Sequence, residues 1–153
     1  MQRREASLVP IVLLLLAAAC GGNAGNADSG TVNCQNDSRV FTYKPNLSVS
    51  STSGMKYILV QSDPAPPARG LDTWTLKVTD SAGTPQPALP VQIRTIMPEH
   101  GHGSSTTPVI TNQGGGNYQV SQLNLFMAGV WKITFSNSAA FTDIADFWFC
   151  VPG

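Results

Sequence analysis

Two histidines and a methionine stand close together in the middle of the chain, within residues 97–103 (MPEHGHG). His100 and His102 are the only histidines of the protein. Because they are two residues apart, their imidazoles would project to the same side of an extended segment and could bind one metal ion. Met97 could add a thioether if the chain bends between it and the histidines. Thioether and imidazole ligands favour copper, Cu(I) in particular, over calcium or magnesium.

A fourth ligand could come from Met127, which lies in a loop-like stretch just before an expected core strand. Loops at one end of a β-sandwich commonly approach each other. Glu99 alternates with His100, so it is expected to point away. The alternative is a metal-free, hydrogen-bonded turn in which Met97 is the last core residue of its strand. Two histidines without a third strong ligand nearby leave both interpretations open.

Short runs with a two-residue hydrophobic period surround this segment and predict strands. The clearest run is 72–80, where Trp74 alternates with polar residues. About seven strands with turn signals between them predict an immunoglobulin-like β-sandwich of two antiparallel sheets, with a partly closed barrel as the alternative. Trp74 and Trp131 are expected core anchors. The candidate strands are 39–43, 56–61, 72–80, 91–97, 108–111, 118–125, 130–135 and 144–151.

The N-terminus has the pattern of an export signal. Two arginines precede an apolar run that is too short to span a bilayer comfortably, which predicts a signal peptide over residues 1–19. The small residues before Cys20 resemble a bacterial lipobox, so Cys20 is expected to be lipidated; the alternative is an ordinary signal with a bystander cysteine. Residues 20–33, rich in Gly, Asn and Ala, are expected to form a flexible tether. The folded domain is then 34–153.

Lipidation would place the protein in the bacterial cell envelope. Gly21 after the cysteine resembles outer-membrane sorting, so the domain would face the periplasm if the cell has two membranes. If Cys20 carries lipid, Cys34 and Cys150 remain at the two ends of the domain, and an exported domain is expected to join them in a disulfide. A thiol pair that binds metal or acts as a redox couple is the alternative.

Composition argues against two classes of function. Charged residues are 12% of the chain and sum to zero net charge, without the clustered Lys and Arg that nucleic acid binding requires. No Ser/His/Asp or Cys/His grouping is legible, so the protein is not expected to be an enzyme, although a triad assembled by folding stays open.

Four segments of the chain are shared in pattern with one family. They are Pro90-Val91 followed by Met97-Pro98-Glu99-His100-Gly101-His102-Gly103, then Gly116-Asn117-Tyr118, and then Phe126-Met127-Ala128-Gly129-Val130-Trp131-Lys132-Ile133. Together they resemble the YtkA-like domain family, small exported or membrane-anchored β-sandwich domains similar in style to FixH-like proteins. The similarity covers about residues 71–135. Family members often have a second methionine where His100 stands, so this chain offers a more nitrogen-rich ligand set.

The resemblance implies copper handling and respiratory-oxidase maturation outside the cytoplasm. We therefore expect a lipid-anchored copper-binding accessory or chaperone domain, with copper as cofactor and Met97, His100, His102 and Met127 as ligands. Its expected partners are the membrane, through the lipid, and a copper-dependent membrane or envelope protein. The alternative is a metal-free immunoglobulin-like interaction module for a membrane or envelope partner.

Overall fold

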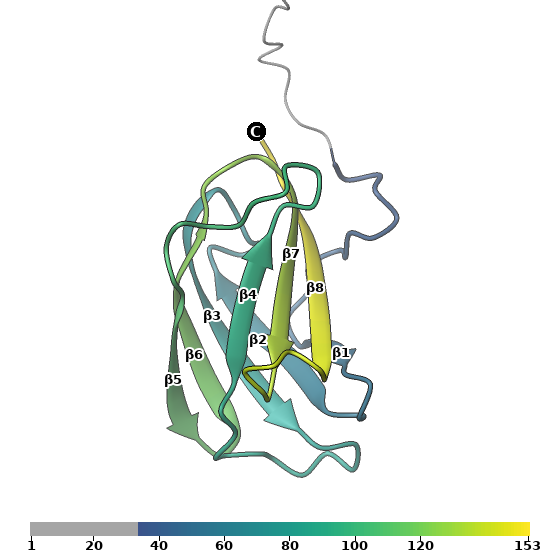
Figure 1. Cartoon of the computed structure of the whole chain (residues 1–153), viewed down its shortest axis with the longest axis vertical. Coiled ribbons are helices and arrows are strands. Elements are labelled where there is room, and N and C mark those ends of the chain that lie inside the picture. Colours follow the sequence, from purple (N-terminus) through teal and green to yellow (C-terminus); the bar gives the residue numbers. More distant parts are fainter. Residues whose placement is uncertain (1–33) are drawn as a thin grey trace, which may run out of the picture.

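The structure, a computed structural model, describes residues 34–153, which form eight strands and no helix (Figure 1). The predicted signal peptide (1–19), Cys20 and the tether (20–33) lie outside these residues. No helix within 34–153 is suited to crossing a membrane. The strands are β1 (Leu47–Ser50), β2 (Lys56–Asp63), β3 (Gly70–Thr79), β4 (Gln92–Ile96), β5 (Val109–Gly114), β6 (Asn117–Leu125), β7 (Gly129–Ser136) and β8 (Ile144–Val151).

The strands form two antiparallel sheets that enclose one core. The larger sheet has the order β1-β2-β3-β6-β5 and the smaller has the order β4-β7-β8. The prediction of an all-β antiparallel sandwich is confirmed. Without β1, the chain order of the strands in the two sheets is that of the A-B-E-D and C-F-G sheets of a seven-stranded constant-type immunoglobulin sandwich.

The predicted alternation places the expected residues in the core. Trp74 in β3 and Trp131 in β7 are both fully buried, as predicted for core anchors. The Trp74 ring lies 5.6 Å from the Phe149 ring and 6.2 Å from the Phe147 ring, both edge-on. In β8 the alternate residues from Ala145 to Val151 therefore face the core. The sequence of β8 is hydrophobic almost throughout, so alternation alone does not show which of its faces points inward.

The prediction of a strand at 39–43, which would open the domain at the edge of a sheet, is wrong. This segment runs beside β8 with a backbone hydrogen bond from Phe41 N–H to the Trp148 carbonyl, 2.9 Å long, but forms no strand. The edge strand is β1, which pairs with β2 from Leu47 opposite Leu59 onward. Asn46, with a positive φ of 63°, redirects the chain into this pairing, and sequence alternation gives no sign of that turn.

A bulge in β6 changes which residues face the core. Tyr118 and Val120 are buried, as strict alternation requires, but farther along the strand the buried residues are Leu123 and Leu125. The parity changes at Gln122, which has a φ of 55° and lies where the pairing with β3 shifts register. An extra residue in one strand of an antiparallel pair produces this shift.

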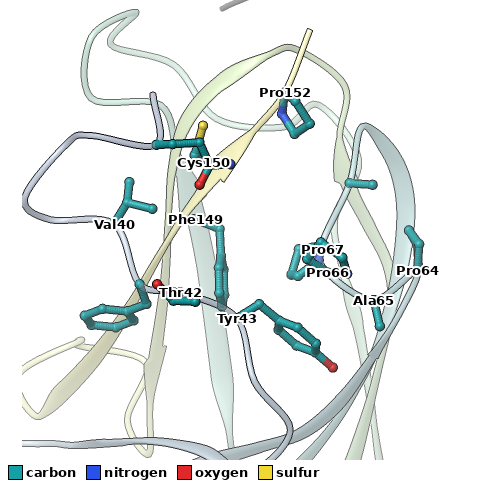
Figure 2. Close-up of a pocket in the computed structure, with 13 residues that line it drawn as sticks. Val40, Thr42, Tyr43, Pro64, Ala65, Pro66, Pro67, Phe149, Cys150 and Pro152 are labelled. Atoms are coloured by element: carbon teal, nitrogen blue, oxygen red, sulfur yellow. The ribbon is translucent and has the colours of Figure 1, made fainter. Parts of the chain in front are cut away.

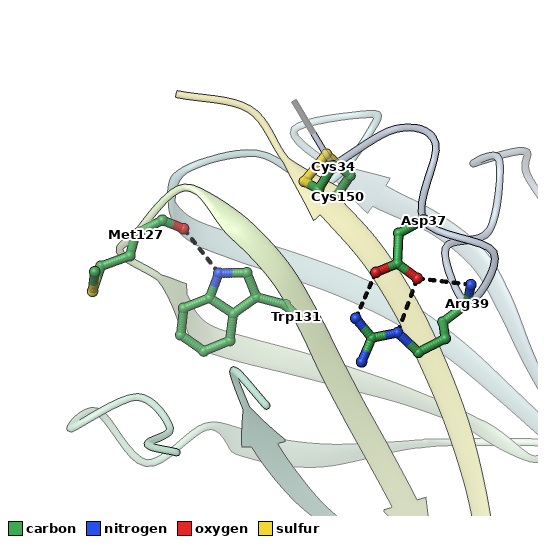
Figure 3. The surroundings of a disulfide bond; sticks show 6 residues. All are labelled: Cys34, Asp37, Arg39, Met127, Trp131 and Cys150. Carbon is green, nitrogen blue, oxygen red and sulfur yellow. Dashed lines mark hydrogen bonds and ion pairs between the residues drawn. A yellow bond between two sulfur atoms is a disulfide. The ribbon is translucent and has the colours of Figure 1, made fainter. Parts of the chain in front are cut away.

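Five segments meet at one end of the sandwich, which we call the disulfide end. Cys34 and Cys150 form a disulfide there, with Cα atoms 5.3 Å apart, as predicted (Figure 3). The register pairs the starts of β3 and β7 with the ends of β6 and β8, so the loops between them gather at this end. The segments at the disulfide end are 34–40, 64–69, 97–103, 126–128 and 152–153.

Candidate metal site

The histidine segment is a tight turn rather than an extended strand end. Met97 N–H donates a 2.7 Å hydrogen bond to the His102 carbonyl, and the amides of His100 and Gly101 both donate to the Met97 carbonyl, at 3.1 and 2.9 Å. Gly101 takes a φ of 68°, which favours glycine. The expectation of an extended segment is therefore wrong, because the chain folds back between Met97 and His102.

The turn nevertheless brings the two imidazoles together. The ring centroids of His100 and His102 lie 5.6 Å apart, with the ring planes tilted by 46°. A metal–nitrogen bond of about 2.0–2.1 Å puts each centroid about 3.2 Å from the ion, so two rings on one ion have centroids at most about 6.4 Å apart. The observed separation lies within that limit, so the spacing of the two rings is compatible with one shared ion.

One ring nitrogen of His102 has a backbone partner. Its Nδ1 lies 3.3 Å from the Gly103 carbonyl oxygen. A donor bond from Nδ1–H to a carbonyl fixes the tautomer that leaves Nε2 as the metal-binding nitrogen. Both imidazoles are exposed, so an ion can reach them from solvent.

Met97 occupies a different environment from the histidines. Its side chain is fully buried within the core, although the loop that it begins is exposed. A Cβ atom placed on Gly129 would lie only 2.7 Å from the Met97 terminal methyl carbon, so the methyl fills the space that the glycine leaves. The thioether thus lies beneath the turn, while the imidazoles lie outside it.

The second predicted loop does approach the first. The Phe126 ring stacks on the His102 ring at 5.8 Å, and it lies edge-on to Trp131 at 5.7 Å. Trp131 Nε1–H donates a 2.9 Å bond to the Met127 carbonyl (Figure 3). Figure 3 also shows the half-buried Met127 thioether pointing away from the disulfide. Met127 therefore lies at the same end of the sandwich as both histidines.

Side chains that sequence reasoning missed surround His100. A pocket of about 350 Å³ is lined by Cys34, Asp37, Glu99, His100, Ala128, Gly129 and Val130. Glu99 does not turn away from His100, because alternation does not apply within a turn. Its carboxylate pairs with Arg39, which also holds Asp37 with a 2.9 Å bond from Nε (Figure 3). The Arg39 guanidinium lowers the pKa of Glu99, and it lowers the pKa of Asp37 to about 2.

The charged residues do not themselves form a metal site. Within residues 34–153, no three or more His, Cys, Asp and Glu side chains are grouped so that they could hold an ion. The donors available at the turn are two imidazoles, with the thioethers of Met97 and Met127 nearby in the fold. This soft and borderline donor set suits copper better than magnesium or calcium.

The sequence model of the YtkA-like family matches residues 52–136, which contain both loops of the candidate site. The chain belongs to the YtkA-like family. Neither the curated proteins nor the solved structures include a match to this chain. The region that matches the YtkA-like family ends before β8 and begins after Arg39. The disulfide and the Arg39–Glu99 ion pair therefore each depend on a residue outside the family match.

Proposed function

We propose that this YtkA-like protein is a membrane-anchored extracytoplasmic lipoprotein that binds copper and acts as an accessory or chaperone in copper handling. His100 and His102 would bind the ion, with Met97 and Met127 as thioether ligands. The observation that carries the proposal is the 5.6 Å separation of the two imidazoles on a closed turn that packs against the Met127 loop. Copper is the ion that this mixture of imidazole and thioether ligands favours.

Each ligand would have a distinct part in binding. The exposed imidazoles would make the first contacts, since they are open to solvent and to an incoming ligand from a partner protein. Met97 would offer sulfur from the dry core beneath the turn, where water does not compete for the ion. A site with exposed ligands on one side is open to exchange, which suits transfer of an ion to another protein.

The proposed anchor supports the same function. If Cys20 is lipidated, the tether over 20–33 leads to Cys34, which lines the same pocket as His100. A flexible segment of that length has an r.m.s. end-to-end distance of about 20 Å. The copper site would then lie close to the membrane surface, within reach of a membrane-bound partner. A Cys20→Ser variant that stays in the membrane fraction would contradict the anchor.

One observation favours the second candidate, a metal-free interaction module. The Met97 side chain is fully buried, and its turn is closed by backbone hydrogen bonds of its own. In this alternative, the histidine loop is a rigid surface for a membrane or envelope partner. Partner binding that survives a strong copper chelator and fails in a His100→Ala/His102→Ala variant would select it.

Metal titration of the full chain in detergent micelles tests copper binding directly. Competition with chelators of known affinity gives the Cu(I) and Cu(II) dissociation constants. Outer-shell changes alone weaken metal sites about 10–100-fold, so the double variant His100→Ala/His102→Ala should weaken binding by more than about 100-fold. Gln119→Ala, an exposed change in β6, is the control. Equal binding by the double variant and the control would refute the proposal.

The thioethers are tested by a second pair of variants. Met127→Leu keeps the size of the side chain but removes the sulfur, so it should weaken Cu(I) binding more than Cu(II) binding. Met55→Leu is the matched control, because Met55 is also half-buried but lies at the opposite end of the sandwich, before β2. A loss of Cu(I) affinity that is the same in both variants would exclude Met127 as a ligand.

A further inference from the structure

Asp72 is a buried acid with one hydrogen bond and one oxygen that has none. It lies in β3 with 1% of its surface exposed. Its Oδ1 accepts a 3.2 Å bond from the Ala68 amide, and its Oδ2 has no partner among the described residues. A buried polar atom without a partner is uncommon in folded proteins, and it is costly when the group is charged.

The hydrogen-bond donor to Asp72 belongs to the wall of a pocket. Residues 64–68, which we call the proline loop, border a pocket of about 460 Å³ at the disulfide end (Figure 2). On the other side the pocket is lined by Tyr43 and Phe149, among others. The pocket is therefore bounded by aromatic rings on one side and by the proline loop on the other.

The proline loop has few backbone donors with which to attach itself. Three of its five residues are proline, which has no N–H, so only Ala65 and Ala68 can donate. The Ala68 amide is bound to Asp72, and the Pro64 carbonyl accepts from the Ser62 hydroxyl. The Asp72 contact is thus a main attachment of the loop to the sheet beneath it.

Within residues 34–153, no cation is placed to compensate a charge on Asp72. Asp63, at the end of β2, is the acidic neighbour, and its charge opposes ionisation. The Arg69 guanidinium is bound to the Phe126 carbonyl at 2.9 Å, and the Tyr43 hydroxyl accepts from the Ser62 amide. β6, the other neighbour of β3, has no charged residue.

The facing sheet offers no countercharge either. Its charged residues are Arg94, Lys132 and Asp146, which alternate with core residues and so lie on the outer surface. Arg94 packs over the Phe141 ring at 4.3 Å, and Lys132 pairs with Asp146 at 3.0 Å. Burial of Asp72, with a smaller effect of Asp63, raises its pKa to about 7 against the lowering effect of the Ala68 amide.

We propose that the protonation state of Asp72 controls whether the proline loop, one wall of the pocket at the disulfide end, stays closed on the sheet; in this role we call the loop the lid. With a neutral carboxyl, the loop stays closed on the sheet. When the proton leaves, Oδ2 carries charge without a partner, and water reaches the carboxylate most easily from the side of the proline loop, whose Ala68 amide contacts Oδ1 and which is not held by strand pairing. The loop therefore opens as pH rises through the pKa of Asp72, independently of copper binding.

Nuclear magnetic resonance of the full chain in detergent micelles tests the lid. From about pH 5 to about pH 9, the Asp72 carboxyl carbon should titrate with a midpoint within about one unit of 7. The Ala68 amide shift should follow with the same midpoint. The apolar dye 1-anilinonaphthalene-8-sulfonate should fluoresce several-fold more strongly above that midpoint. An Asp72 midpoint near 4, or an Ala68 amide that does not follow Asp72, would overturn the proposal.

Two variants separate the lid from a general effect of pH. Asp72→Asn should make the Ala68 amide shift and the dye fluorescence independent of pH across this range. Asp63→Asn removes the like charge, so the midpoints of Asp72 and Ala68 should both move to lower pH. If Asp72→Asn does not fold, Asp63→Asn decides through the dye: a dye midpoint that moves together with the Asp72 midpoint supports the lid, and a dye midpoint that stays in place refutes it.

Discussion

Replacing Asp72 by asparagine is expected to stabilise the fold at neutral and alkaline pH. Burial raises the pKa of this carboxyl from 3.8 to about 7, so between these values the folded chain keeps a proton that the unfolded chain has lost. The free energy of unfolding therefore falls as pH rises through that window, and it stays lowered above it. The change in the pKa of Asp72 corresponds to a loss of at most about 4 kcal/mol in the free energy of unfolding. Water that reaches the carboxylate past the proline loop lowers this loss, so we expect about 2–4 kcal/mol.

Urea denaturation followed by tryptophan fluorescence, at several pH values from about 4 to about 8, measures this effect. The stability gain of Asp72→Asn over the unmodified chain should be near zero at the acid end and should grow up to about neutral pH. The comparison cancels the opposite trend from carboxylates such as Asp143, whose pKa is lowered and which lose stabilising contacts as pH falls. Asp63→Asn, an exposed matched control, should give a much smaller change. A gain that is constant with pH would refute the reasoning.

Two other stability effects follow from the disulfide end. The bond between Cys34 and Cys150 spans 116 residues, so replacing both by serine should cost up to about 4–5 kcal/mol; an unchanged melting temperature would contradict this. A Cβ on Gly103 would lie 2.1 Å from the Thr95 carbonyl oxygen, so Gly103→Ala must shift backbone and should cost about 1–3 kcal/mol in urea denaturation. Gly101→Ala meets no atom but requires a positive φ, and should cost only about 1 kcal/mol; equal losses would refute the contact argument.

The β-sandwich can be predicted from the sequence because the core strands share one pattern, the alternation of apolar and polar side chains. A two-residue period carried by large side chains places Trp74 and Trp131 in the core whatever the details of the turns. The edge strand is less determined by the sequence, since residues 39–43 are richer in strand-forming residues than β1 and yet only β1 pairs with β2. The choice between them depends on the turn at Asn46, where one residue adopts a positive φ.

Some features of the candidate site can likewise be predicted from the local sequence, and others depend on contacts between residues far apart in the chain. The pair of histidines and the approach of the Met127 loop follow from spacing and from sandwich topology. The stacking of Phe126 on His102 and the ion pair between Arg39 and Glu99 join residues far apart in the chain. No periodic pattern marks such contacts, because each depends on how two irregular loops meet.

The role of Met97 cannot be decided from its residue type and its position in the sequence. A flexible thioether is suited both to filling a core and to binding a soft metal, so its type and position cannot separate the two roles. Gly129 adds the missing information, because the absence of a Cβ there creates the space that the Met97 methyl fills. Any use of the Met97 sulfur as a ligand must therefore compete with this packing, whereas the exposed imidazoles bind without such a cost. Copper binding at this turn should accordingly depend first on His100 and His102.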